Sequence, residues 1–208
     1  MKHLLRYFVP LALTLTAITA QAQFYKIHNA DVAIGGTGQF TTTLTSDGYT
    51  STGVNQQFTT NSPGALISFR EHPVAWAGVE VNYSYTRYSQ RYQDYNSTSN
   101  STTGYSLSND VHELTAAYMF HPHFLHLQPF VNVGGGALDF LPDGTVHQWR
   151  SAGLLETGFD IPTSNKHFGF RVQGRSLYYR APNFDHASLS TRSWVVTEEP
   201  SLSAYIRF

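Results

Sequence analysis

The feature that most constrains this chain is a period-two alternation of apolar and polar residues, which recurs about eight times along the sequence. The segment Ser201–Phe208 shows it clearly, because every second residue is apolar and most of the others are polar. Side chains on a β-strand point alternately to opposite faces, so each such segment predicts a strand with one apolar and one polar face. Helical periodicity is hard to find, and the sequence therefore predicts an all-β fold.

The alternation predicts eight antiparallel strands, and the connections between them differ in length. Three connections are short and contain proline ("REHPVA", "MFHPHFLH" and "DIPTSNKH"), whereas "SDGYTSTGVNQQ", "SQRYQDYNSTSNSTTGYS" and "RAPNFDHASLSTR" are longer. Short turns at one end and long loops at the other are typical of a closed transmembrane β-barrel with periplasmic turns and outer loops. The first hairpin is the least clear, so a ten-strand barrel is the alternative. The expected strands are Asp31–Thr45, Thr59–Glu71, Val74–Tyr88, Ser106–Phe120, His126–Phe140, His147–Ile161, His167–Tyr179 and Ser193–Phe208.

The polar faces of these strands are rich in matched charges. Only 13% of the residues are charged, and lysine is nearly absent from the strands. Buried charges must be paired, and the guanidinium fork of arginine suits carboxylates. A soluble β-sandwich or lipocalin-type barrel would instead bury the apolar face, and would more naturally carry lysine on the polar one. We therefore expect an inside-out barrel whose interior holds a charge network. Its expected members are Arg70, Glu80, Glu113, Arg150, Glu156, Arg171, Arg175, Glu199 and Arg207.

The first residues are typical of a secretory signal. Lys2 and Arg6 supply a positive start, Leu11–Ile18 is a short apolar stretch, and Ala20–Ala22 is a small-residue cleavage pattern. We expect residues 1–22 to be a cleaved signal peptide and residues 23–208 to be the barrel domain. The chain has no cysteine, which excludes a disulfide framework, and a net charge of −1, which predicts no surface for nucleic acid.

Two short stretches resemble a known class of proteins. The end "SLSAYIRF" resembles the C-terminal strand of bacterial outer-membrane barrels, and "LHLQPFVNVGGGALDF" resembles a central strand of small OmpA-like or OmpX-like barrels. The resemblance implies that Phe208, with Ile206 and Leu202, is read by the barrel-assembly machinery. It also implies a porin-like protein of a Gram-negative-type outer membrane, surrounded by lipid and lipopolysaccharide. It does not extend to the peptidoglycan-binding domain of full-length OmpA proteins, so no cell-wall tethering is carried over.

Histidines give the only suggestion of a metal site. "HPHFLH" places His121, His123 and His126 close together, but no carboxylate lies beside them. Interfacial histidines in a turn explain the pattern as well, and we expect no metal and no cofactor.

Catalytic chemistry is not expected either. A lipid A-modifying hydrolase or acyltransferase is the alternative, suggested by Asp185 and the pair His186 and Ser188, although no matching glutamate is found. His112 and Glu113 are adjacent on a strand and therefore face opposite sides.

The sequence thus predicts a structural or surface-interaction role for the barrel. Outer loops rich in tyrosine, serine and asparagine suit adaptable contacts with a surface ligand. A narrow pore or small-solute transporter, and a lipid-modifying or proteolytic enzyme, remain as alternatives. An eight-stranded interior is just wide enough for side chains, which disfavours a large open channel.

Overall fold

The computed structural model describes residues 29–47, 53–96, 101–122, 128–144, 146–165, 167–182, 184 and 193–208. The predicted signal peptide of residues 1–22 lies outside these ranges. Within them no helix has the length and apolar character needed to cross a membrane. The strands are β1 (Ala30–Thr41), β2 (Leu44–Asp47), β3 (Gly53–Thr59), β4 (Ser62–Val74), β5 (Ala77–Asn96), β6 (Ser101–Phe120), β7 (Gln128–Pro142), β8 (Gln148–Pro162), β9 (Phe168–Arg180) and β10 (Trp194–Arg207).

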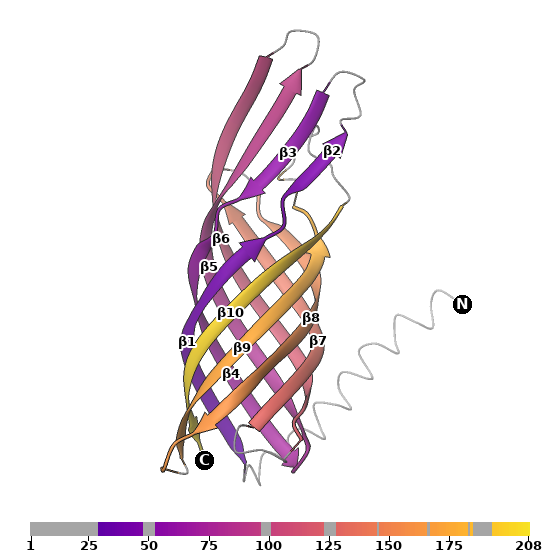
Figure 1. Cartoon of the computed structure of the whole chain (residues 1–208). Helices are drawn as coiled ribbons and strands as arrows, with labels where there is room; N and C mark the ends of the chain where they lie inside the picture. Colours follow the sequence, from indigo (N-terminus) through magenta and orange to yellow (C-terminus); the bar gives the residue numbers. More distant parts are fainter. Residues whose placement is uncertain are drawn as a thin grey trace, which may run out of the picture.

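These strands form one antiparallel sheet that closes on itself (Figure 1). The order is β2-β3-β5-β4-β1-β10-β9-β8-β7-β6, and the additional pairing of β5 with β6 closes the barrel wall, with β3 and β2 extending from β5. The first strand also pairs with the last, from Asp31 opposite Arg207 to Thr41 opposite Thr197. Closure removes the open edges that a flat sheet would present to the membrane.

The barrel wall contains eight strands, as predicted, although the sheet has ten strand segments. Short breaks in the first hairpin separate β2 from β1 and β3 from β4. Strand β5 therefore pairs with β4 along its first half, as far as Thr86, and with β3 beyond that, from Gln90 onward. The unclear first hairpin is thus one pair of interrupted strands, and the ten-strand alternative is wrong.

Two stretches that were expected to be loops consist largely of strand, so both of these predictions are wrong. The stretch 89–106 was expected to be a loop, but β5 and β6 are each 20 residues long and occupy most of it. Tyrosine and threonine favour extended, paired backbone, and no proline interrupts the stretch, so its polarity alone gave a misleading signal. Part of the expected first loop forms β3 in the same way. Together β2, β3, β5 and β6 make a protruding sheet that rises beyond the other strands (Figure 1).

The distribution of side chains is inside-out, as predicted. Apolar side chains on the exterior are well exposed, with Ile34 at 64% and Leu202 at 59%, whereas Arg70, Arg171 and Arg175 are fully buried. The alternation along each strand produces this arrangement, because adjacent residues face opposite sides of the wall. An apolar exterior around a polar interior is the distribution that a membrane-spanning barrel requires.

The interior has two halves of different character, which the alternation did not predict. The end of the barrel with the C terminus and the short turns, called here the short-turn end, encloses charged side chains. Toward the opposite, long-loop end the interior is filled by an apolar cluster. Phe140 packs against Tyr179 and against Phe184, at ring-centroid distances of 5.7 and 6.3 Å. The apolar cluster comprises Tyr88, Tyr92, Val111, Leu138, Phe140, Leu154, Leu177, Tyr179, Phe184 and Val195, with three alanines.

Candidate functional site

Arg175 on β9 is the centre of one group of buried charges. Its Nη1 donates to Glu199 of β10 at 2.6 Å, and its Nη2 donates to Glu113 of β6. Its Nε lies 3.5 Å from Glu156 of β8. The guanidinium and the three carboxylates are essentially inaccessible to solvent, so each charge depends on the others for compensation.

Arg70 on β4 is the centre of a second group. Its Nη2 lies 3.0 Å from Glu80 of β5 and donates to Glu156 at 3.1 Å. The side-chain amide of Asn132 on β7 donates to both of these glutamates. The guanidinium also stacks on the ring of Phe130, with its Cζ 3.9 Å from the centroid. Because Glu156 contacts both Arg70 and Arg175, it links the two groups.

Arg171 forms a third group toward the short-turn end. Its Nε donates to Asp160 at 2.7 Å and its Nη2 donates to Asp31 at 2.9 Å. Arg207 lies further out, with its Nη2 3.8 Å from Asp160 and 4.0 Å from Asp31. The side chain of Arg207 is 27% exposed, so it forms the rim of the charged interior.

These residues form what we call the lumen network. Every one of the eight wall strands contributes at least one member, so the network connects the wall across the interior. Its members are Asp31 (β1), Arg70 (β4), Glu80 (β5), Glu113 (β6), Asn132 (β7), Glu156 and Asp160 (β8), Arg171 and Arg175 (β9), and Glu199 and Arg207 (β10).

The sequence prediction of this site differs from the structure at three charged residues, and it also omits the uncharged Asn132. Arg150 faces inward near the long-loop end, where its guanidinium donates to Gln148 and to a backbone oxygen, and it does not join the network. Asp31 and Asp160 do join it and were missed. Asp160 lies an even number of residues from Glu156, so the same period-two argument could have placed it inside. Asp31 opens the first strand, where too few alternations precede it to fix the face.

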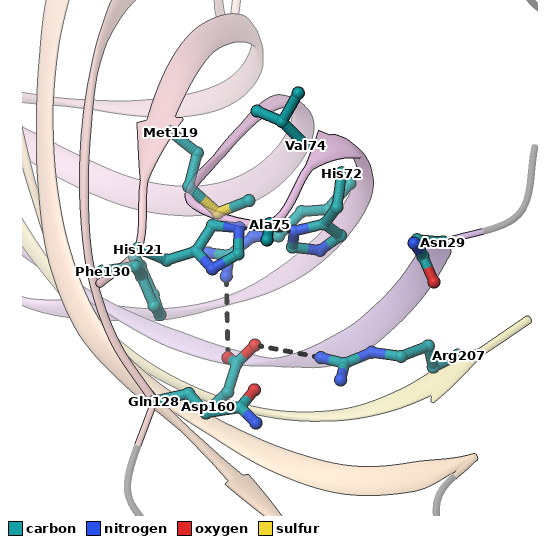
Figure 2. Close-up of a pocket in the computed structure, with 11 residues that line it drawn as sticks. Asn29, His72, Val74, Ala75, Met119, His121, Gln128, Phe130, Asp160 and Arg207 are labelled. Carbon is teal, nitrogen blue, oxygen red and sulfur yellow. Dashed lines mark hydrogen bonds and ion pairs between the residues drawn. The ribbon is translucent and has the colours of Figure 1, made fainter. Parts of the chain in front are cut away.

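A chain of side chains lines the mouth of the barrel at the short-turn end. The Nε2 of His72 lies 3.2 Å from Asp31, and its Nδ1 lies 3.0 Å from the Nε2 of His121. The two imidazoles meet edge to face. They form one wall of a cavity of about 200 Å³, the mouth cavity, which is also lined by Arg70, Asp160 and Arg207 (Figure 2).

Of the three histidines considered as metal ligands, the structure describes only His121. His121 is buried and faces His72, while His123 and His126 lie outside the described residues. In the part of the chain that the structure describes, no three His, Asp or Glu side chains are arranged to hold a metal ion.

Of the residues considered for catalysis, the structure describes His112 and Glu113, and it does not bring these two together. His112 contacts the hydroxyl of Tyr83 on the exterior, at 2.7 Å, whereas Glu113 points inward to Arg175. The two side chains therefore face opposite sides of the wall, as the alternation predicts. Asp185, His186 and Ser188 lie outside the described ranges.

The C-terminal strand presents the residues of the expected assembly signal on the exterior. Phe208, Ile206 and Leu202 are 63%, 55% and 59% exposed. The backbone N–H of Phe208 donates to the carbonyl oxygen of Ala30 at 2.8 Å, which ties the end of the chain to the first strand.

The closed antiparallel wall, the apolar exterior and the charged interior define a small outer-membrane-type β-barrel fold. The chain is similar to Neisserial surface protein A, with 12% identity, 87% of this chain and 97% of that chain covered, and a TM-score of 0.55. Weaker likenesses are to Ail, the attachment invasion locus protein of Yersinia pestis (16% identity, 88% and 100% covered, TM-score 0.46), and to the N-terminal barrel of Pseudomonas aeruginosa OprF (13%, 86% and 97%, 0.45). No protein-family profile and no curated protein sequence matches the chain. The likeness to Neisserial surface protein A shows the fold.

Proposed function

We propose that this protein is a surface protein of the bacterial outer membrane, in which the barrel is an anchor and the protruding sheet is the part that contacts partners. The observation that carries this proposal is the length of β5 and β6. The part of the hairpin between Gln90 and Leu107 has no pairing with β7 among the described residues, because β7 pairs with β6 only from Asn109 onward. It instead pairs with β3 and so extends the sheet away from the wall.

The filled interior supports an anchor more than a pore. The lumen network occupies the short-turn half and the apolar cluster occupies the other half. A solute path along the barrel axis would have to separate buried ion pairs and then displace close-packed aromatic side chains. The narrow-pore alternative therefore requires a rearrangement, whereas the anchor does not.

Aromatic side chains at the two ends of the exterior support the position in the membrane. Trp76 packs against Phe120 at the short-turn end. Toward the long-loop end Trp149 and Trp194 are each 64% exposed, and the guanidinium of Arg180 lies 5.4 Å from the ring of Trp194. Tryptophan concentrates where a bilayer meets water, so these positions suit contact with outer-membrane lipid and lipopolysaccharide. The exposed Phe208 suits recognition by the barrel-assembly machinery.

The test is to remove the protruding hairpin without disturbing the barrel. Gln90 pairs with Leu107, so residues 91–106 can be replaced by an Asn-Gly turn that preserves the register. Cells displaying the intact or the shortened protein are compared for adhesion to cultured epithelial cells and for aggregation with each other. Slower migration after heating, measured by gel electrophoresis, verifies that both proteins are folded barrels.

The proposal predicts that adhesion or aggregation requires the intact hairpin. Equal behaviour of the two proteins in both assays would contradict it. Steady conductance in planar bilayers would then favour a pore, and a change in the mass of lipid A on expression would favour an enzyme.

A further inference from the structure

We propose that the mouth cavity binds a copper(I) ion between the imidazoles of His72 and His121, with the thioether of Met119 as a third ligand. All three side chains line this cavity, and Figure 2 shows them on the side that faces Asp160 and Arg207. The proposal is independent of the role of the protruding sheet.

The first argument is the spacing of the two imidazoles. The Nδ1 of His72 lies 3.0 Å from the Nε2 of His121, and the rings are nearly perpendicular. Two imidazole nitrogens that bind one first-row metal ion at about 2.0 Å, with trigonal or tetrahedral angles, are about 3.3–3.5 Å apart. The two nitrogens therefore need to separate only slightly for an ion to replace the hydrogen bond between them.

The second argument is that one of these nitrogens is prepared to bind a metal. The carboxylate of Asp31 can only accept a hydrogen bond, so the Nε2 of His72 donates to it and neutral His72 has its lone pair on Nδ1. The other oxygen of Asp31 accepts from Arg171 at 2.9 Å, which fixes the carboxylate. Histidines that ligate metals characteristically donate their second N–H to a carboxylate in this way. Binding then requires only that His121 carry its proton on Nδ1 instead of Nε2.

The third argument is the position of Met119. The backbone N–H of His121 donates to the carbonyl oxygen of Trp76 at 3.0 Å, which continues the pairing of β5 with β6 to this residue. Met119 and His121 are therefore two residues apart on a paired strand and share its inward face. Thioether sulfur and imidazole nitrogen are ligands that suit copper(I). This set contains a thioether, so it differs from the sets of three His, Asp or Glu side chains that the described residues lack.

The charge around the cavity favours a cation. Four carboxylates and three guanidinium groups lie on or directly behind its wall, so the formal balance is −1. The guanidinium groups are all within 4.0 Å of these carboxylates, and the single positive charge of copper(I) would balance the excess. The seven groups are Asp31, Glu80, Glu156 and Asp160 with Arg70, Arg171 and Arg207.

The two imidazoles can be reached from the short-turn end. The side chain of His72 is 11% exposed, and the cavity that it lines also borders the exposed rim residue Arg207. An ion entering here does not have to pass the deeper ion pairs of Arg175. The cavity, at about 200 Å³, is several times the roughly 30 Å³ that one water occupies in the liquid, so it has room for an ion.

The test uses the protein purified without an affinity tag from the membranes of expressing cells and kept in dodecyl maltoside. Copper(I) is supplied with ascorbate under nitrogen as its coloured bicinchoninate complex, and transfer to the protein is measured as loss of that colour. His72→Gln and His121→Gln each remove one imidazole, and His112→Gln is the matched control on the exterior. His121→Gln leaves the contact of His72 with Asp31 intact, so it covers a failure of His72→Gln to fold. Gel migration of unheated and heated samples verifies the fold of each variant.

Two further variants define the ligand set. Met119→Leu removes the thioether and keeps an apolar side chain of similar size. A double variant, His123→Gln with His126→Gln, removes the other histidines of the turn that contains His121 and leaves the proposed ligands in place.

We expect one copper(I) ion per chain, with equal affinity in the wild type, in His112→Gln and in the double variant. His72→Gln and His121→Gln should each weaken the affinity at least about a hundredfold, and Met119→Leu about tenfold or more, because each removes a ligand. No transfer of copper to the wild type would overturn the proposal. An unchanged affinity in His72→Gln or His121→Gln, or loss of binding in the double variant, would also overturn it, and an unchanged affinity in Met119→Leu would contradict the thioether ligand.

Discussion

At the scale of single residues, the most consequential feature is that each buried arginine contacts several carboxylates and compensates their charges. Arg175 contacts Glu113, Glu156 and Glu199. Of these three carboxylates, only Glu156 contacts a second guanidinium among the described residues, that of Arg70. Removing one guanidinium therefore leaves more than one buried charge without compensation. Buried ion pairs of this kind contribute little compared with apolar packing, but breaking one by deletion of a single partner is strongly destabilising.

We predict that Arg175→Met destabilises the folded barrel by about 3–5 kcal/mol. Arg150→Met should change the free energy of unfolding by less than about 0.5 kcal/mol, because Arg150 contacts no carboxylate among the residues that the structure describes. Urea unfolding in liposomes, followed by tryptophan fluorescence and by migration of unheated samples in gels, measures both. Equal stabilities of the two variants would show that the charges inside the barrel are not coupled as described.

The physical cause can be separated from loss of volume by a second substitution. Glu199→Gln removes one of the charges that Arg175 compensates. In the Arg175→Met background this change should recover part of the lost stability, whereas in the wild type it should destabilise. Additive effects of the two substitutions would contradict the coupling.

Most of this network could be predicted from sequence because the period of a strand is regular. Counting by twos along one strand from Arg150 places Glu156 inside, and counting by twos along the next strand from Arg175 places Arg171 inside. Arg150 has the same parity and does face inward, but parity says nothing about height along the barrel, and the carboxylates lie nearer the other end. The pairing of His72 with His121 depends on two turns meeting at the mouth, which no local pattern encodes.

At the scale of strands, close approach of β6 and β7 depends on glycine. A methyl group at Gly136 would overlap the carbonyl oxygen of Leu114 and the Cα of Thr115, and one at Gly134 would overlap the carbonyl oxygen of Ala116. At Gly174 on β9, by contrast, an added methyl group would meet nothing within 4 Å. The same residue type therefore has different roles in the two strands.

We predict that Gly136→Ala destabilises the barrel by about 1–3 kcal/mol, because β6 and β7 must separate to admit the methyl group. Gly174→Ala should be neutral, or stabilising by up to about 1 kcal/mol, because it reduces the freedom of the unfolded chain. Urea midpoints of the two variants in the same liposomes test this. A midpoint for Gly136→Ala at or above that of Gly174→Ala would contradict the close approach.

Strand ends were harder to predict than strand faces, and the reason lies in composition. The stretch 89–106 is polar enough to be solvated as a loop, and the same polarity suits a paired hairpin that lies outside the membrane. Polarity therefore cannot separate a loop from a strand that has left the membrane. Pairing with β3, a segment some 40 residues away in sequence, decides the outcome.

At the scale of the whole molecule, the barrel is closed around a filled interior. The sequence predicted the closed wall and the charged half, because both follow from alternation. It did not predict the apolar cluster, since Leu177 and Tyr179 face inward beside the outward Tyr178 and the alternation is lost there. Inward apolar residues near the long-loop end replace charges and exclude water from that half of the interior.

We predict no steady single-channel conductance from the refolded protein in planar bilayers. The buried ion pairs of the lumen network and the aromatic side chains of the apolar cluster both lie inside the barrel, and ions would have to displace them in order to pass. Reproducible open steps in the wild type would contradict this, and would show that the network rearranges in the membrane.

The inside-out arrangement, with the apolar face of each strand toward lipid and the polar face toward the interior, can be tested position by position along β10. The chain has no cysteine, so single cysteines can be introduced along Ser201–Ile206, labelled with a nitroxide in urea and refolded into liposomes. Accessibility to molecular oxygen, which concentrates in the bilayer, is then measured at each position. The structure predicts high values at Leu202, Ala204 and Ile206 and low values at Ser201, Ser203 and Tyr205. A reversed alternation, or none, would contradict the inside-out barrel.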